Sequence, residues 1–226
     1  MENKCKYIVI EGVDGVGKTT QCNLLVTYLR NLGYKVLQTK EPGSEHAPLT
    51  MELRNIMLNA KYDNSLTVAA RELISQAIRS IHLEKVIIPA KNEYDFIIQD
   101  RGILSGLAYG QACGNDLDWI INMSNIIVKN ADKAFDGQPT LLYDKIIILS
   151  GNIQNSLNKA IKAKQEFTHG DAIENKGASF MESVGINMLN YSTFFNARHI
   201  NVDGKNIDEV FSEIINTLNL EGTNAY

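Results

Sequence analysis

The sequence predicts a three-layer α/β domain built on a five-stranded parallel sheet. Short runs rich in valine and isoleucine recur along the chain, and the gaps between them are long enough for crossover helices. Parallel strands that are covered on both faces read as apolar runs of this kind. The chain has 226 residues, of which 44% are hydrophobic, so we expect one domain over residues 1–226 with its own core.

The predicted strands follow one another with helical patterns between them. They are Tyr7–Gly12, Lys35–Lys40, Tyr94–Asp100, Lys145–Ser150 and Ala197–Gly204. In open α/β sheets, ligands bind at the carboxyl ends of the strands. The residues that follow each run are therefore the first candidates for a functional site.

A glycine-rich stretch joins the first predicted strand to a helical pattern that ends near Gly33. Its sequence, GVDGVGKTT, fits the P-loop pattern G-x4-G-K-[ST] in the context that this motif requires, strand before and helix after. Glycines let successive backbone amides point at phosphate oxygens, and the helix N-terminus adds its positive end. We therefore predict a P-loop NTPase fold whose nucleotide phosphates are held by Gly12, Val13, Asp14, Gly15, Val16, Gly17, Lys18, Thr19 and Thr20.

The third predicted strand ends in an acidic residue, Asp100, followed by Arg101. An aspartate at the carboxyl end of a strand suits the acidic partner of a P-loop magnesium site. We expect Thr19 and Asp100 to ligate Mg2+ and Lys18 to reach the β- and γ-phosphates. The predicted catalytic residues are Lys18, Asp100 and Arg101.

Composition excludes several other classes of protein. A net charge of −4 and a sequence pI near 5.6 argue against a general nucleic-acid binder. Three widely spaced cysteines without a C-x-x-C pair suggest neither a disulfide framework nor a zinc site. A strand begins soon after Met1 and no run approaches a membrane span. We expect a cytoplasmic protein that binds neither nucleic acid nor membrane.

The fate of the phosphate depends on the rest of the chain. A GTPase would need an N-K-x-D motif for the base, and the nearest approach, NKGA at Asn175, lacks the aspartate. A motor or transporter ATPase does not fit so short a chain. A kinase for a small acceptor fits better, because several charged residues are placed to bind one. They are Asp14 inside the loop, Glu41 and Arg54 around the second predicted strand, Arg79 on a predicted helix, and Arg101 after the third strand.

Six segments resemble the thymidylate kinase family along nearly the whole chain. The opening YIVIEGVDGVGKTTQ resembles the family's P-loop with its internal aspartate, and TKEPGS resembles its T-R-E-P-G segment. ELRNIMLN is similar to the helix with a phosphate-binding arginine, and ELISQAIRSIHLEKVIIPA to E-L-L-F-A-A-D-R-x-x-H. DRGILSGLAYGQA is similar to D-R-Y-x-x-S-x-x-A-Y/F, and DAIENKGASFMESV to the D-R-I-E exit of the family's lid.

The resemblance implies ATP- and Mg2+-dependent phosphorylation of a deoxynucleoside 5′-monophosphate, foremost dTMP to dTDP, by a homodimer. It places Asp14 on the acceptor's 3′-hydroxyl, Arg54 and Arg101 on its phosphate, and Arg79 at its base. Tyr109 would lie near the sugar and base. The expected acceptor site is completed by Glu41, Ser75 and Ser105.

Four positions depart from the family pattern and leave alternatives open. Ser75 stands where a base-stacking Phe is usual, Gly102 where an aromatic residue or His follows the D-R pair, and Gly15 and Ala172 where arginines occur. The alternatives are a kinase for another or modified deoxynucleotide, such as a 5-substituted deoxyuridylate, a kinase of an unrelated small metabolite, or a nucleotide-binding relative with little kinase activity. A small helical lid is expected near residues 157–177. Three of its lysines are Lys159, Lys162 and Lys164, and Lys164 is the first candidate to replace the missing arginine.

Overall fold

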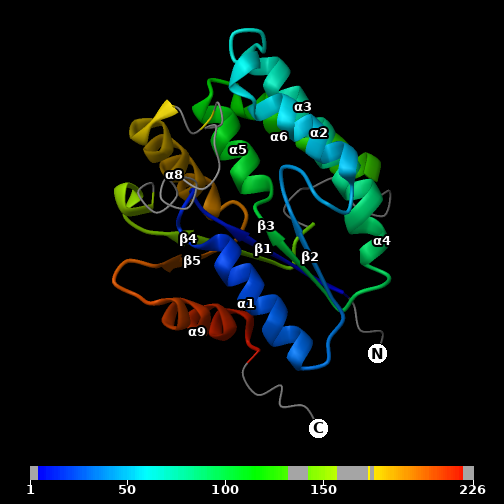
Figure 1. The fold of residues 1–226 in the computed structure, drawn as a ribbon, viewed down its shortest axis with the longest axis vertical. Helices are drawn as coiled ribbons and strands as arrows, with labels where there is room; N and C mark the ends of the chain where they lie inside the picture. The colour runs from blue at the N-terminus through cyan, green and yellow to red at the C-terminus, as the bar shows by residue number, and fades with distance from the viewer. Residues whose placement is uncertain (1–4, 132–141, 157–172, 174–175, 221–226) are drawn as a thin grey trace.

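The computed structural model describes residues 5–131, 142–156, 173 and 176–220. Its parallel strands form one sheet in the order β2-β3-β1-β4-β5 (Figure 1). The predicted five-stranded parallel sheet is therefore confirmed. The strands are β1 (Lys6–Glu11), β2 (Val36–Lys40), β3 (Phe96–Asp100), β4 (Lys145–Ser150) and β5 (Arg198–Asn201).

Burial explains why these runs became strands. The inner strands β1, β3 and β4 are buried along almost their whole length, whereas the edge strand β5 buries only Ile200 of its four residues. Its predicted span of eight residues was accordingly too long. Register sets Ile10 beside Asp100 on one neighbour and beside Ile147 on the other. The carboxyl ends of β1 and β3 therefore meet at one edge of the sheet.

Helices cover both faces of the sheet (Figure 1). α1 and α9 pack together on one face, and on the other side α5 packs on α8 and α6 packs on both α3 and α5. The helical elements are α1 (Lys18–Asn31), α2 (Pro48–Leu58), η1 (Ala60–Tyr62), α3 (Val68–His82), η2 (Leu83–Ile87), α4 (Ile88–Ala90), α5 (Ile103–Ala112), α6 (Leu117–Ala131), α8 (Ala178–Ser192) and α9 (Ile207–Leu218).

Most of the predicted lid, including Lys159, Lys162, Lys164 and Ala172, lies outside the described residues. Within the described ranges, no helix has the length and apolar character needed to cross a membrane. All three cysteines are free thiols, with Cys5 and Cys22 buried and Cys113 half-buried.

Candidate active site

The loop between β1 and α1 is shaped by glycines. Gly12, Gly15 and Gly17 have φ of 145°, 76° and 106°, a region that residues with a side chain rarely adopt. A Cβ at Gly12 would also collide with the carbonyl oxygen of Leu149 on β4. Only glycine permits this turn, and the turn brings the first residues of α1 to the carboxyl edge of the sheet.

Lys18 is folded back into this loop. Its side chain is buried, and Nζ donates a hydrogen bond of 2.8 Å to the Val13 carbonyl. Burial, followed by the charge of Arg101, lowers the pKa of Lys18 to about 8. The amine lies among backbone groups that would cradle phosphate oxygens, and an anion there would stabilise its charged form.

Thr19 and Asp100 meet across the β1–β3 edge. The Thr19 hydroxyl donates to Oδ2 of Asp100 at 2.5 Å. Oδ1 of Asp100 is buried and has no hydrogen-bond partner among the described residues. A buried acceptor without a partner is costly, and oxygen atoms of this kind are the ligands that Mg2+ takes. The pair therefore fits a magnesium site.

Arg101 joins the phosphate loop to the start of α5. Its backbone is left-handed, with φ of 65°. Its guanidinium contacts Oδ1 of Asp14 at 2.5 Å and donates to the Gly12 carbonyl at 3.0 Å and the Ser105 hydroxyl at 3.1 Å. Burial alone would lower the pKa of Arg101, but Tyr109 and Asp14 raise it, so the group keeps its charge. Tyr109 in turn donates to Oδ2 of Asp14 at 3.3 Å.

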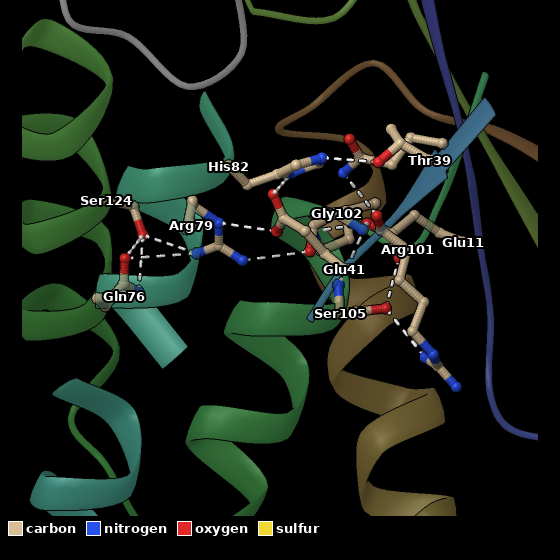
Figure 2. Close-up of polar contacts among 12 residues, drawn as sticks. Glu11, Thr39, Glu41, Gln76, Arg79, His82, Arg101, Gly102, Ser105 and Ser124 are labelled. Atoms are coloured by element: carbon tan, nitrogen blue, oxygen red, sulfur yellow. Dashed lines mark hydrogen bonds and ion pairs between the residues drawn. The ribbon is translucent and has the colours of Figure 1, made fainter. Parts of the chain in front are cut away.

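Glu11 is a structural residue of the site that the sequence analysis missed. Its fully buried carboxylate accepts hydrogen bonds from the backbone amides of Gly102, Leu104 and Ser105 at 2.9, 3.0 and 3.3 Å (Figure 2). The Ser105 hydroxyl donates to its other oxygen at 2.5 Å. Glu11 thus satisfies amides at the start of α5, which would otherwise have no partner. A glutamate that ends an apolar strand was the available signal.

One pocket beside the phosphate loop brings together every residue predicted to bind the acceptor. Its wall comes from the P-loop, the segment after β2, and helices α2, α3 and α5. The eight predicted residues that line it are Asp14, Glu41, Arg54, Ser75, Arg79, Arg101, Ser105 and Tyr109. Their roles toward a nucleotide remain predictions, but their shared location follows from the fold.

Arg79 is held by a buried network behind this pocket (Figure 2). Its Nε contacts Oε2 of Glu41 at 3.2 Å, while His82 Nδ1 lies 3.0 Å from the other carboxylate oxygen. Burial would raise the pKa of Glu41, but Arg79 and His82 hold it below its usual value. His82 Nε2 also lies 2.8 Å from the Thr39 hydroxyl. The network fixes the Arg79 guanidinium against the pocket wall.

The glycine after the D-R pair has a packing reason. A Cβ at Gly102 would lie 3.0 Å from the Tyr143 hydroxyl oxygen and 3.1 Å from Cγ1 of Val9. Both neighbours are buried. Tyr143 therefore fills the space into which a side chain at position 102 would extend, and this departure from the family pattern is compensated by a residue 41 positions later.

Comparisons with known proteins agree with this architecture. A family model described as thymidylate kinase matches residues 10–214. A probable thymidylate kinase of Pyrococcus horikoshii is 32% identical over 211 residues, covering 92% of this chain and 93% of the relative. A thymidylate kinase of Prochlorococcus marinus is 34% identical over 187 residues, covering 80% of each.

A solved structure shares the fold. The crystal structure of thymidylate kinase from Ehrlichia chaffeensis superposes with a TM-score of 0.68 at 24% identity, and the match covers 95% of this chain and 99% of that one. The family model spans most of the chain, and the relatives match it over most of their own lengths. This chain belongs to the thymidylate kinase family.

Proposed function

We propose that this protein transfers the γ-phosphate of ATP to the 5′-phosphate of dTMP, giving dTDP and ADP for DNA synthesis. The observation that carries the proposal is the contact between phosphate loop and acceptor pocket. Arg101 lines the pocket and also bonds to Asp14 and the Gly12 carbonyl of the loop. Donor and acceptor phosphates bound on its two sides would meet at one guanidinium, which suits transfer better than hydrolysis.

The reaction is an in-line displacement at phosphorus. An oxygen of the acceptor phosphate forms a bond to the γ-phosphorus, while the bond to the β–γ bridging oxygen breaks and ADP leaves. Lys18 and Arg101 neutralise the negative charge around the transferred group. Thr19 and Asp100 would hold Mg2+, which would offset the negative charge of the donor phosphates.

The proposal also gives the acceptor an orientation in the pocket. Arg54 and Arg101 hold its phosphate near the loop, and Asp14 accepts a hydrogen bond from the 3′-hydroxyl. Tyr109 contacts the sugar, and Arg79 donates to a carbonyl of the base. These roles rest on the family pattern and on the common location of the residues in the pocket.

Coupled ADP release against a panel of deoxynucleoside monophosphates tests the proposal. We expect release with dTMP well above the rate with ATP alone. The panel includes 5-hydroxymethyl-dUMP, because Ser75 stands where the family has Phe. If the folded protein binds ATP but releases ADP with no member of the panel, it is a nucleotide-binding relative and the proposal is wrong.

We also propose that the enzyme is a cytoplasmic homodimer. α2 packs on α3, α3 packs on α6, and the three helices lie together on one side of the molecule (Figure 1). They expose large aliphatic side chains that a second copy would cover: Leu49, Ile56, Leu73 and Ile126, which are 41–59% exposed. Light scattering after size exclusion should give twice the mass of 25.2 kDa, and a monomeric mass would contradict the proposal.

A further inference from the structure

A buried carboxylate, Glu72, lies in the acceptor pocket and pairs with no cation among the residues that the structure describes. Glu72 on α3 is 5% exposed and lines the pocket. Oε1 accepts a hydrogen bond of 2.8 Å from Nε2 of Gln76. In the described part of the chain, Oε2 accepts no hydrogen bond and Glu72 forms no ion pair. A buried carboxylate in this state is costly unless something in the pocket pairs with it.

Gln76 sets the orientation of this carboxylate relative to Arg79. Its amide oxygen lies 3.5 Å from Nη1 of Arg79 and 3.3 Å from the Ser124 hydroxyl, while its nitrogen faces Glu72 (Figure 2 shows Gln76, Ser124 and Arg79). The Gln76 amide therefore lies between Arg79 and Glu72, with its oxygen toward the cation and its nitrogen toward the anion. Because Gln76 binds Oε1, Oε2 of Glu72 can accept a hydrogen bond from a molecule in the pocket.

Helix α5 faces both charged groups at its glycines. A Cβ at Gly106 would collide with the Arg79 guanidinium, and one at Gly110 would lie 2.8 Å from Oε2 of Glu72. Four residues of helix rise about 6 Å. A hydrogen-bond donor and an acceptor therefore lie along one pocket wall, about one helical turn apart, where they can bind neighbouring groups on one edge of a base.

We infer that Glu72 and Arg79 together read the imide edge of the acceptor base, which rests on the proposed function. Arg79 donates to a ring carbonyl, and Glu72 accepts the hydrogen bond of the adjacent N3–H. Thymine and uracil present this pair of groups. Cytosine presents an amine and an unprotonated ring nitrogen instead, so that both protein groups would be left unpaired. Glu72 is thus a specificity-determining residue, and Gln76 positions it.

Binding measurements without ATP test the inference. Calorimetric titrations of dTMP, dUMP and dCMP are compared among the wild type, Glu72→Gln and the matched control Glu52→Gln. Glu52 is exposed on α2, so its change removes the same charge outside the pocket. A glutamine at position 72 accepts from N3–H of thymine or donates to N3 of cytosine. The ratio of the dCMP and dTMP dissociation constants should fall about tenfold or more in Glu72→Gln and stay unchanged in Glu52→Gln.

A ratio within twofold of wild type in folded Glu72→Gln overturns the inference, as does a wild type that binds dTMP and dCMP equally. If Glu72→Gln does not fold, Gln76→Met replaces it: this variant keeps the carboxylate but removes the amide that orients it, and an unchanged ratio there also overturns the inference. A wild type that binds dTMP without releasing ADP refutes the proposed function alone, because the ratio still decides the role of Glu72. A wild type that binds none of the three refutes both.

Discussion

The phosphate loop and the acceptor pocket adjoin each other but are built in opposite ways. The loop is one short stretch, Gly12–Thr20, and its shape comes from glycines with positive φ. The pocket takes side chains from α2, α3, α5 and the segment after β2. Backbone groups bind any polyphosphate, whereas side chains distinguish one base from another. Substitutions in the loop should therefore change the rate, and substitutions in the pocket should change the preferred base.

The largest effect is expected at the loop. Lys18→Ala should lower kcat by a factor on the order of 10^2–10^3 or more, because Lys18 stabilises charge that develops during transfer. Stability should be nearly unchanged or higher, since the variant removes a buried cation whose one hydrogen bond within the described ranges goes to the Val13 carbonyl. ADP release and thermal unfolding followed by circular dichroism measure the two quantities. A folded variant with most of the wild-type activity would show that the loop does not bind the transferred phosphate.

Glu11 connects the two regions, and its loss should affect the fold. Glu11→Ala leaves three backbone amides of the α5 start and the Ser105 hydroxyl without their acceptor. We expect the free energy of unfolding to fall by about 3–5 kcal/mol. Urea denaturation compares it with Ser105→Ala, which removes one of the four donors and should cost about 1 kcal/mol. Equal losses in the two variants would mean that Glu11 does not hold α5 in place.

How far the sequence predicted each region follows from this difference in construction. The loop and the ends of β1 and β3 are local patterns, so Lys18, Thr19 and Asp100 could be identified with the element that positions each. The bond from Glu11 to Gly102 spans 91 residues, and local patterns carry no signal for such a contact. Tyr143, which packs against Gly102 from 41 residues away, was missed for the same reason.

The pocket residues that were predicted came from the family resemblance, which supplies long-range information that periodicity lacks. Arg79 and Glu41 illustrate its limit. Both were expected to contact the acceptor, yet each is also held by the other in a buried ion pair. Substituting either one would disturb the pocket wall as well as any contact with the base. Lys164 lies outside the described residues and stays a prediction.

A substitution at Ser75 tests the expectation that changes in the pocket alter the preferred base. Ser75 is half-buried in the pocket wall, where the family pattern has an aromatic ring. A ring stacked on a base contributes on the order of 1–3 kcal/mol, so Ser75→Phe should tighten dTMP binding about tenfold while excluding bases with bulky 5-substituents. Calorimetry measures both effects, with the exposed Ser65→Phe as control. Weaker dTMP binding in Ser75→Phe would show that another group already occupies the stacking position.

The smallest expected effect is the pH dependence of ATP binding, which isolates the electrostatics of the loop. The pKa of Lys18 is lowered to about 8 in the free protein, first by burial. The triphosphate favours the charged amine, so binding becomes coupled to proton uptake as the pH rises above that value. The phosphates themselves lose their last proton near pH 6–7 and add little above it. Between pH 7.5 and 9, we expect ATP affinity to fall about eightfold.

Folding should depend on this group in the opposite direction. The pKa of Lys18 is lowered from 10.5, so the unfolded chain binds more protons than the folded one between about pH 8 and 10.5, and the contribution of Lys18 to stability rises over that window. A loss of ATP affinity caused by partial unfolding would instead accompany a fall in stability. Lys18→Arg keeps its charge throughout and should bind ATP with little dependence on pH. If the wild type and Lys18→Arg lose affinity in parallel, the titrating group is elsewhere, and proton uptake by Lys18 is not coupled to ATP binding.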